Sequence, residues 1–419
     1  MTSAERQGAN GRETQPDSKL RTANHTPVLE VAIILVPLVG AVSGVLLART
    51  LGPTGRGYVA SFTVGVQFVG FCCGLSLDKG LIHELAIRGG RGVAVWRAAW
   101  RPTVLLAALA AFCGLAWGAV IHLPTWMLLF LGVGAALTVL SEAVSAWAIG
   151  HHYMLACSIW RLVFPVLWTI SIVLLVPFAT STNDTVIVTA LGLAYCIALA
   201  ISTIWLARVT GVPGWELGYK GKATGLISYS LRYHPSSMAS FLGSRIDLIM
   251  APLFLTPADV GLYAVALAPA ALAGAPGSAI TLRGMAGSSM PHRRVLIPAY
   301  LLSVAGGLLI LPWALPWLFG AEFAPAVVPA QVLTLSVLVG MVTTYVAASM
   351  AARRHLAMSA SLQSGILLLT VVGIGVTWWR GGGILGLALA VLVARALGAG
   401  ASLVLARRPS RQDPRAGST

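Results

Sequence analysis

Two short stretches of the chain carry the same pattern. Residues 48–60 read ARTLGPTGRGYVA, and residues 252–264 read PLFLTPADVGLYA. Four residues recur between them at a constant offset of 204 positions: Leu51 and Leu255, Pro53 and Pro257, Gly57 and Gly261, Ala60 and Ala264. Pro and Gly turn a chain, and the Gly can open the helix that follows. The match predicts that one structural unit occurs twice.

Each stretch lies where one apolar segment ends and the next begins. A membrane-spanning helix needs about 20 apolar residues, and twelve such segments can be read: 28–50, 57–80, 102–122, 125–149, 156–178, 185–207, 228–252, 260–281, 295–317, 325–349, 358–379 and 383–405. Residues 81–90 could form a short interfacial helix. The two stretches lie six segments apart, so both copies share one orientation. We therefore expect an all-α polytopic membrane protein with two six-helix lobes, a parallel repeat around a central cavity.

The composition supports a membrane protein. The chain is 57% hydrophobic and 10% charged, with a mean hydropathy of +0.84, whereas soluble domains carry about 25% charged residues. This excludes a soluble enzyme, a disordered protein and a disulfide scaffold as descriptions of the whole chain. The five cysteines lie in apolar stretches without a CxxC or a His at ligand spacing. We expect neither a disulfide framework nor a metal site.

The basic residues predict the orientation. With the N-terminus inside, 23 of the 28 Lys and Arg residues fall on the cytoplasmic side, and only Arg49, Arg56 and Arg380 fall outside. Arg245 and Arg395 lie within spans. Cytoplasmic loops carry an excess of Lys and Arg, so both termini should be cytoplasmic. Most of the net charge of +15 is then an orientation signal, and no nucleic-acid partner is expected.

Five segments follow from these spans. Residues 1–27 are polar and should form a disordered cytoplasmic tail rather than a signal peptide. Residues 28–208 should form the N-lobe, 209–227 a cytoplasmic linker, and 228–406 the C-lobe. Residues 407–419 should form a basic cytoplasmic tail. That tail and the basic cytoplasmic face would bind anionic membrane lipids.

Four segments, in the right order, resemble the polysaccharide flippases. These are the O-antigen and lipid-linked oligosaccharide translocases of the MOP superfamily, which also holds MATE drug exporters and lipid II flippases. The segments are LLARTLGPTGRGYVASFTVGVQFVGFCCGLSLDKGLIHELA (46–86), SSMASFLGSRIDLIMAPLFLTPADVGLYAVA (236–266), LPWLFGAEFAPAVVPAQVLTLS (315–336) and GGGILGLALAVLVARALGAG (381–400). One departure is the compressed loop at 283–294, where the family usually has a longer basic amphipathic stretch.

The resemblance implies a function. The protein would flip a polyprenyl-pyrophosphate-linked oligosaccharide across the bacterial cytoplasmic membrane, in cell-surface polysaccharide biosynthesis. Two lobes would alternate access to a hydrophilic cavity. Coupling to H⁺, Na⁺ or the membrane potential is common in such relatives. No cofactor and no enzymatic activity are expected.

Charged residues within the predicted spans are the first site candidates. A charge at the bilayer centre costs at least about 2.5–3.5 kcal/mol, so it needs a partner or a wet cavity. Arg245 would contact a pyrophosphate or an acidic sugar. Asp247 points about 200° away on the same helix and would set the lobe interface or bind a cation. Glu142 could carry a proton or bind Na⁺ with Ser141 and Ser145. Each could instead be an interhelical structural partner.

Four further residues are candidates near the ends of spans or in the last span. Arg49 and Arg161 could bind and steer an anionic headgroup, or extend to lipid phosphate. Arg395 could face the cavity and contact substrate, or pair with an acid. Asp78 could take part in coupling or at the lobe interface, or only form a local ion pair with Lys79.

Three other functions remain open. One is a MATE-type cation-coupled antiporter, although an arginine-lined interior fits an anionic cargo better than a cationic drug. Another is a lipid II flippase, although those relatives usually have fourteen spans. The third is a membrane polysaccharide polymerase or ligase. Such enzymes need a large outer loop with catalytic Arg and His, whereas the outer loops predicted here are short.

Overall fold

The computed structural model describes residues 26–88, 92–175, 177, 184–214, 224–285, 293–352 and 356–407. The two predicted tails therefore lie almost wholly outside the described residues, as do residues 215–223 of the predicted linker. The α-helices, in chain order, are α1 Thr26–Cys73, α2 Leu77–Arg88, α3 Gly92–Val120, α4 Thr125–Gly150, α5 Met154–Leu175, α6 Asp184–Val209, α7 Thr224–Met250, α8 Pro257–Met285, α9 Arg293–Phe319, α10 Val327–Ala352, α11 Leu356–Trp379 and α12 Gly383–Arg407. Short 3₁₀ helices cover Ala251–Leu253 and Ala321–Ala326.

Helix α1 contains the first two predicted spans. It runs without a loop, but the backbone is not helical at Gly52, where φ is +61°. Glycine adopts this left-handed conformation without steric cost, and Pro53 follows it directly. The prediction of two helices is confirmed, because two helices meet at this kink. The connection expected between 50 and 57 was wrong, because a single glycine is enough to redirect the chain.

The boundaries predicted around the second and third spans were also wrong. The second span ends at Cys73, not at 80, because Leu75 and Ser76 adopt positive φ values of 48° and 52° and stop the helix. The short helix predicted at 81–90 is α2, which begins at Leu77. Helix α3 begins at Gly92, ten residues before the predicted span, and places Arg97 and Arg101 inside its first turns.

All twelve predicted spans correspond to helices. In the described part of the chain, nine helices are long and apolar enough to cross a membrane, and α1 is one of these although it holds two spans. Val304–Phe319 of α9 is apolar but shorter. Helix α7 is not among the nine. It carries Arg232, Arg245 and Asp247, which lower its mean hydropathy.

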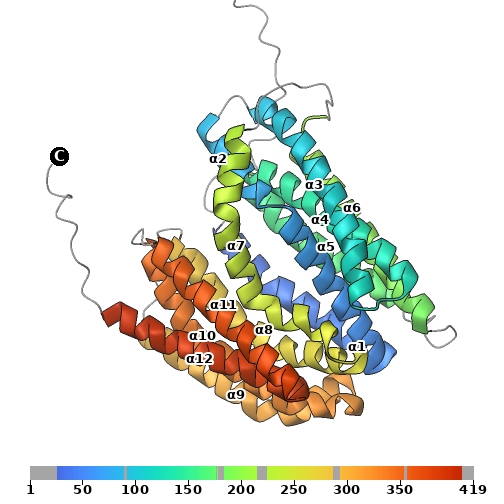
Figure 1. The fold of residues 1–419 in the computed structure, drawn as a ribbon, viewed down its shortest axis with the longest axis vertical. Coiled ribbons are helices and arrows are strands. Elements are labelled where there is room, and N and C mark those ends of the chain that lie inside the picture. Colours follow the sequence, from blue (N-terminus) through green and yellow to red (C-terminus); the bar gives the residue numbers. More distant parts are fainter. Residues whose placement is uncertain are drawn as a thin grey trace, which may run out of the picture.

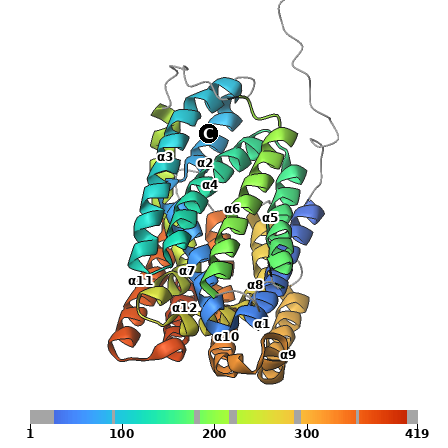
Figure 2. The same ribbon diagram turned by 90° about the vertical axis from the view of Figure 1, so that its right-hand side faces the viewer.

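The helices form two lobes. Helix α3 packs on α4 and α5 on α6, whereas α10 packs on α8 and α12. Figure 1 shows the lobes as two arms that meet where α1 passes α8 and diverge away from that contact, with α7 between them. Figure 2 shows the helices of both lobes running roughly along one direction. This is the predicted arrangement of two six-helix halves.

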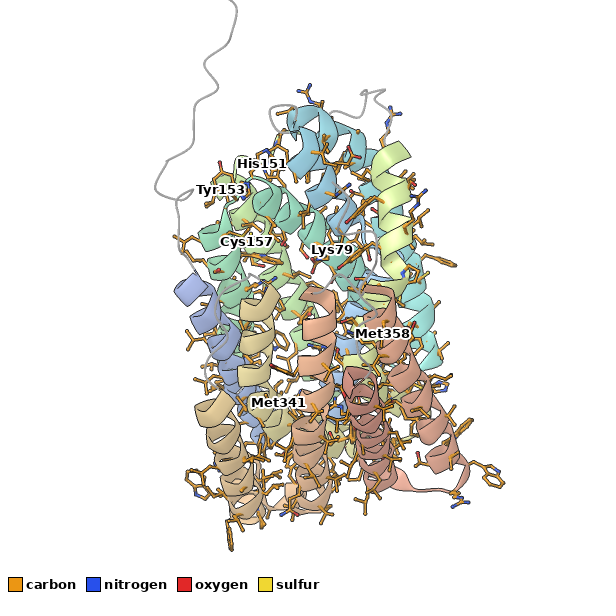
Figure 3. The ribbon with its side chains drawn as sticks, turned by 90° about the vertical axis from the view of Figure 1, so that its left-hand side faces the viewer. Lys79, His151, Tyr153, Cys157, Met341 and Met358 are labelled. Atoms are coloured by element: carbon orange, nitrogen blue, oxygen red, sulfur yellow. The ribbon has the colours of Figure 1, made fainter. Side chains whose placement is uncertain are left out.

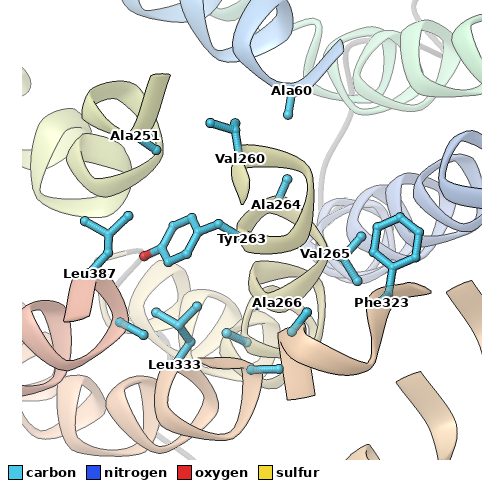
Figure 4. Close-up of a cluster of buried hydrophobic side chains, with 14 of the residues drawn as sticks. Ala60, Ala251, Val260, Tyr263, Ala264, Val265, Ala266, Phe323, Leu333 and Leu387 are labelled. Carbon is cyan, nitrogen blue, oxygen red and sulfur yellow. The ribbon is translucent and has the colours of Figure 1, made fainter. Parts of the chain in front are cut away.

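Each lobe has its own hydrophobic core. In the C-lobe, Tyr263, Leu333 and Leu387 come together from α8, α10 and α12, as Figure 4 shows. Ala48 and Ala60 of α1 belong to the same cluster. The C-lobe core therefore continues across the contact between the lobes, which explains why the two lobes are held together at that end.

Candidate substrate path between the two lobes

The two repeated stretches pack against each other. A Cβ atom added to Gly57 would collide with the carbonyl oxygen of Pro257, and one added to Gly261 would collide with that of Pro53. The contact is reciprocal and joins backbone to backbone. The Gly and Pro of one stretch contact the Pro and Gly of the other, and these are the residues that correspond to each other at the 204-residue offset. The contact also closes the bundle at the end that the charge pattern predicts to be outside.

Arg49 crosses between the lobes near this closure. Its Nε donates to the carbonyl oxygen of Leu318 at 2.7 Å, and its Nη2 donates to that of Trp317. Both carbonyls lie in the last turn of α9, where the helix dipole favours a cation. The side chain remains exposed. Whether Arg49 also binds substrate stays a prediction, but at least two of its five donors hold α9.

Arg245 lies on α7 and reaches the other lobe. Its Nη1 donates to Oε1 of Gln67 on α1 at 2.6 Å, and the side chain is exposed. Gln67 also hydrogen-bonds the buried hydroxyl of Tyr195 on α6. Sequence reasoning missed Gln67 and Tyr195. The available signal was an amide inside an otherwise apolar span, because such a group needs a hydrogen-bond partner.

Asp247 takes partners within the C-lobe. It is only 5% exposed and accepts a hydrogen bond of 2.6 Å from the Tyr263 hydroxyl on α8. Arg395 of α12 donates to Ser336 of α10 at 3.0 Å and acts electrostatically on Tyr263. Asp247 and Arg245 thus have different partners, as their separation of about 200° around α7 predicts. The roles of Asp247 and Arg395 in transport remain predictions.

A second group of charges lies in the N-lobe. Glu142 on α4 is exposed, and the charges that act on it are those of Asp78, Lys79 and Arg161. Arg161 is exposed on α5. Lys79 and Asp78 form an ion pair of 2.8 Å on α2. In Figure 3, the label of Lys79 lies at a height between those of His151, in the N-lobe, and Met358, in the C-lobe.

The chemistry of this group differs in part from the prediction. Ser141 and Ser145 are buried, and Ser141 donates to the Thr138 carbonyl at 2.8 Å, so they do not share the exposed face of Glu142. Burial lowers the pKa of Lys79, but the charge and hydrogen bond of Asp78, together with electrostatic interactions with Glu142 and Tyr233, raise that pKa above its ordinary value. In the described part of the chain, no three His, Cys, Asp or Glu side chains are placed to hold a metal ion.

A stripe of hydroxyl groups runs along α7. Tyr233, Ser240 and Ser244 are exposed and Ser237 is half-buried, and the four follow each other at spacings of four, three and four residues. On a helix these positions share one face, about 110° from Arg245. Sequence reasoning missed this hydroxyl stripe. The spacing of the four hydroxyl groups by three and four residues was the signal in the sequence, and the charged residues of the same segment overshadowed it.

The hydroxyl stripe lies on a helix that contacts both lobes, because α7 packs on α1 and α2 of the N-lobe and on α8 and α11 of the C-lobe. One side of α7 contacts α1 through Arg245 and through Phe241, whose ring stacks on Phe71 at 4.4 Å. Another side contacts α8 through Asp247, and Ile246 packs on the C-lobe core. By helical spacing, the hydroxyl stripe lies between the side that carries Phe241 and the side that carries Asp247, on a helix that α2 and α11 also contact. Its inner end, at Tyr233, is within electrostatic reach of Lys79.

Comparison with known proteins identifies the fold. No family profile and no curated protein sequence matches the chain. An inward-facing multidrug resistance MATE family transporter of the MOP superfamily matches with a TM-score of 0.66 and 12% identity, over 90% of this chain and 97% of that one. The lipid II flippase MurJ, inward closed, matches with a TM-score of 0.67 and 11% identity, over 91% and 88%.

A third solved structure is a MOP superfamily transporter from Pyrococcus furiosus, described as having a binding pocket of reverse polarity that suggests a different function. It matches with a TM-score of 0.57 and 13% identity, over 93% of this chain and 96% of that one. The chain therefore has the two-lobed fold that MATE transporters and the MurJ flippase share.

Proposed function

We propose that the protein is a flippase for an anionic, hydroxyl-rich lipid, namely a polyprenyl-pyrophosphate-linked oligosaccharide. The observation that carries this proposal is the polarity of α7. This helix lies between the lobes, yet it exposes the hydroxyl stripe and Arg245. Polar side chains at membrane depth are costly in lipid and favour a wet path.

The two chemistries on α7 fit two parts of such a substrate. A guanidinium offers five N–H donors in a planar fork that matches phosphate oxygens. Hydroxyl groups can donate and accept hydrogen bonds with sugar hydroxyls. The hydroxyl stripe spans roughly 16 Å from Tyr233 to Ser244 at 1.5 Å per residue. That length accommodates more than one sugar unit next to an anion at Arg245.

The direction of movement follows from the closure at one end. The backbone contact between Gly57 and Pro257 shuts the end predicted to be outside, and the lobes diverge toward the end predicted to be cytoplasmic. Substrate would enter from the cytoplasmic leaflet and leave after the lobes rock. The shared fold with a lipid II flippase supports this use of the scaffold.

A cation-coupled antiporter of the MATE type is the second candidate. The observation that favours it is the exposed carboxylate of Glu142, which forms no ion pair among the described residues. Such a group could carry H⁺ or Na⁺ through the membrane. The cationic Arg245 beside the hydroxyl stripe favours an anionic cargo. We therefore assign Glu142 a role in coupling transport to a cation, rather than in drug export.

A flux assay tests the proposal. The protein is reconstituted with a fluorescent polyprenyl-pyrophosphate oligosaccharide, and exposure of the glycan to an enzyme in the opposite compartment is measured with and without a H⁺ or Na⁺ gradient. We expect protein-dependent exposure, and loss of at least about tenfold in Arg245→Ala, because one charged contact to phosphate is removed. Arg232→Ala, another exposed arginine on α7, is the control.

Two outcomes would contradict the proposal. The first is an absence of protein-dependent exposure under every gradient. The second concerns Arg245 alone: if Arg245→Ala lowers membrane abundance as much as flux, Arg245 is a structural residue.

A further inference from the structure

We infer that Gln67 is the positioning residue that presents Arg245 to the anionic group of the substrate. Because Gln67 belongs to the N-lobe and Arg245 to the C-lobe, the anion site is complete only while the lobes keep the present arrangement. The inference rests on the proposed function and assigns the substrate's anion to one site.

The partner of Arg245 is neutral, and this preserves its charge. Gln67 Oε1 accepts the hydrogen bond from Arg245 Nη1 at 2.6 Å. A carboxylate at this position would form an ion pair and cancel the positive charge. Asp247 is close in sequence, but it accepts the Tyr263 hydroxyl on another side of α7. An amide therefore fixes the guanidinium and leaves its charge available to a ligand.

Tyr195 holds Gln67 in place. Its ring is buried and meets three other rings edge to face: Phe62 at 5.5 Å, Phe164 at 5.0 Å and Trp168 at 5.4 Å. Such contacts favour one ring orientation. The Tyr195 hydroxyl bonds the Gln67 amide, so the rigid aromatic box orients the amide, and the amide orients the guanidinium.

The hydrogen bond to Gln67 leaves the other N–H donors of the Arg245 guanidinium for a phosphate. Arg245 has five N–H groups, and the described residues engage one nitrogen, Nη1, with Gln67. The side chain is exposed, and Ser244, the last residue of the hydroxyl stripe, precedes it in the sequence. An arginine held in advance loses less side-chain entropy when it binds two phosphate oxygens. A pyrophosphate would meet a preorganised site.

The positions on two lobes make the site depend on conformation. Gln67 and Tyr195 belong to α1 and α6 of the N-lobe. Arg245 belongs to α7, which contacts α2 of the N-lobe as well as α8 and α11 of the C-lobe, and which is tied to the C-lobe next to Arg245 by the hydrogen bond from Tyr263 to Asp247. Rocking of the lobes that opens the outer end separates Gln67 from Arg245. The guanidinium then loses its support, and affinity for the anion falls on the side where substrate is released.

Binding to the full-length protein in lipid nanodiscs tests this inference. The probes are farnesyl pyrophosphate and the neutral alcohol farnesol, and the readout is the Kd at pH 8. In Gln67→Ala we expect about tenfold weaker binding of the pyrophosphate, as for one hydrogen bond to a charged group. In Gln67→Glu we expect at least about a hundredfold loss, because the carboxylate neutralises Arg245. Farnesol binding should not change.

Two controls separate positioning from packing. Gln331 is also an amide within a helix, and its Nε2 donates to the Leu308 carbonyl at 3.1 Å; Gln331→Ala should keep the affinity of the unmodified protein. In Gln67→Glu, lowering the pH protonates the new carboxyl group, which then resembles the amide, so affinity should recover relative to the unmodified protein. Tyr195→Phe, which keeps the aromatic box, should lose about threefold, which is about half of one such hydrogen bond.

A cross-link tests the dependence on the lobes. Cys72 Sγ lies 3.9 Å from Met238 Sδ, between α1 and α7. In Met238→Cys, with the other four cysteines replaced, a short bifunctional thiol reagent should join the helices in this arrangement. Pyrophosphate affinity should persist while flux stops.

The possible failures are distinct. If the unmodified protein binds farnesyl pyrophosphate no better than farnesol, the proposed function fails. If it prefers the pyrophosphate but Gln67→Glu binds equally well at pH 8, Gln67 is not a positioning residue. Equal losses in Gln331→Ala and Gln67→Ala, or a cross-linked protein that no longer binds, would also overturn the inference.

Discussion

Single residues at membrane depth have one of two environments in this protein. Asp247 is buried and is held by the Tyr263 hydroxyl inside the C-lobe. Arg245 and Glu142 are exposed between or beside the lobes. A buried charge must keep its partner, because an unsatisfied one costs free energy, whereas an exposed one is available to a ligand. Burial therefore separates the charged residues that stabilise a lobe from those that can contact the substrate.

Tyr263→Phe tests the structural part of this distinction. The substitution removes the donor to buried Asp247, so the free energy of unfolding should fall by about 1–2 kcal/mol. Thermal unfolding in detergent measures it as a lower Tm. Tyr233→Phe is the control, because Tyr233 is 41% exposed, and its Tm should stay unchanged. An unchanged Tm in Tyr263→Phe would show that Asp247 is satisfied by other groups.

The candidate site was only partly predictable at this scale. Charged residues such as Arg245 and Asp247 stand out within apolar spans, so the sequence was sufficient to select them. Their partners Gln67 and Tyr263 are neutral, and Gln67 lies 178 positions away from Arg245. A contact over that separation depends on how the lobes pack. Single-sequence patterns do not contain that information.

At the scale of elements, the two copies of the repeated turn reach one geometry by different chemistry. In the first copy, Gly52 adopts a positive φ and α1 continues. In the second, the corresponding residue is Thr256, whose hydroxyl donates to Asp259 Oδ2 at 2.7 Å and accepts the Asp259 N–H at 3.2 Å. This exchange caps the start of α8. The sequence predicted the place of both turns from shared Pro and Gly, but not this difference.

Helix boundaries were less predictable than helix existence. Apolar length predicted a helix for every span, because bilayer thickness fixes that length, although among the described residues α7 and α9 are less apolar or shorter than the other spans. The break at Leu75 and Ser76 directly follows Gly74, a local signal that the apolar length of the span outweighed in the prediction. Tertiary packing of α2 against α4 and α7 stabilises the turn.

Gly57→Val tests the contact between the repeated turns. A side chain at this position would collide with the Pro257 backbone, and backbone cannot move aside as a flexible side chain can. We expect the outer ends of the lobes to separate. Labelling of Ala60→Cys by a membrane-impermeant maleimide from the outer side, in a background without native cysteines, should rise several-fold, because Ala60 is buried at this contact.

The control for this experiment is on the same helix. A Cβ atom added to Gly40 meets no atom within 4 Å, so Gly40→Ala should leave the labelling of Ala60→Cys unchanged. If Gly57→Val labels no faster than the unmodified background, the glycine contact does not close the outer end.

At the scale of the whole molecule, the described residues form a small number of polar links between the lobes, one of them between Ser76 Oγ and His234 Nδ1 at 3.0 Å. Arg49 binds the end of α9 at the outer side, and Arg245 binds Gln67 deeper between the lobes. Both are hydrogen bonds from a cation to a neutral acceptor. They are strong enough to favour one arrangement and weak enough to break during a transport cycle. The balance between arrangements should therefore respond to single substitutions.

Arg49→Ala tests this balance. Loss of its hydrogen bonds to the Trp317 and Leu318 carbonyls removes about 1–3 kcal/mol from the closed outer arrangement. That shifts the ratio of the two arrangements by about 5- to 150-fold. Spin labels at the exposed positions Ile87 and Val404 should report a shorter distance between α2 and α12 as the inner ends approach. An unchanged distance distribution would show that Arg49 does not hold the lobes.

The reciprocal contact has a consequence for the origin of the chain. Each turn presents a Pro carbonyl and a glycine, and each meets the same pair on the other turn. A surface that is complementary to itself in this way is an isologous interface, the kind that joins two identical subunits around a two-fold axis. One six-helix half could thus have assembled as a symmetric dimer before the halves were fused. Only after fusion could Gly52 and Thr256 diverge, and only then could Gln67 and Arg245 specialise on opposite sides.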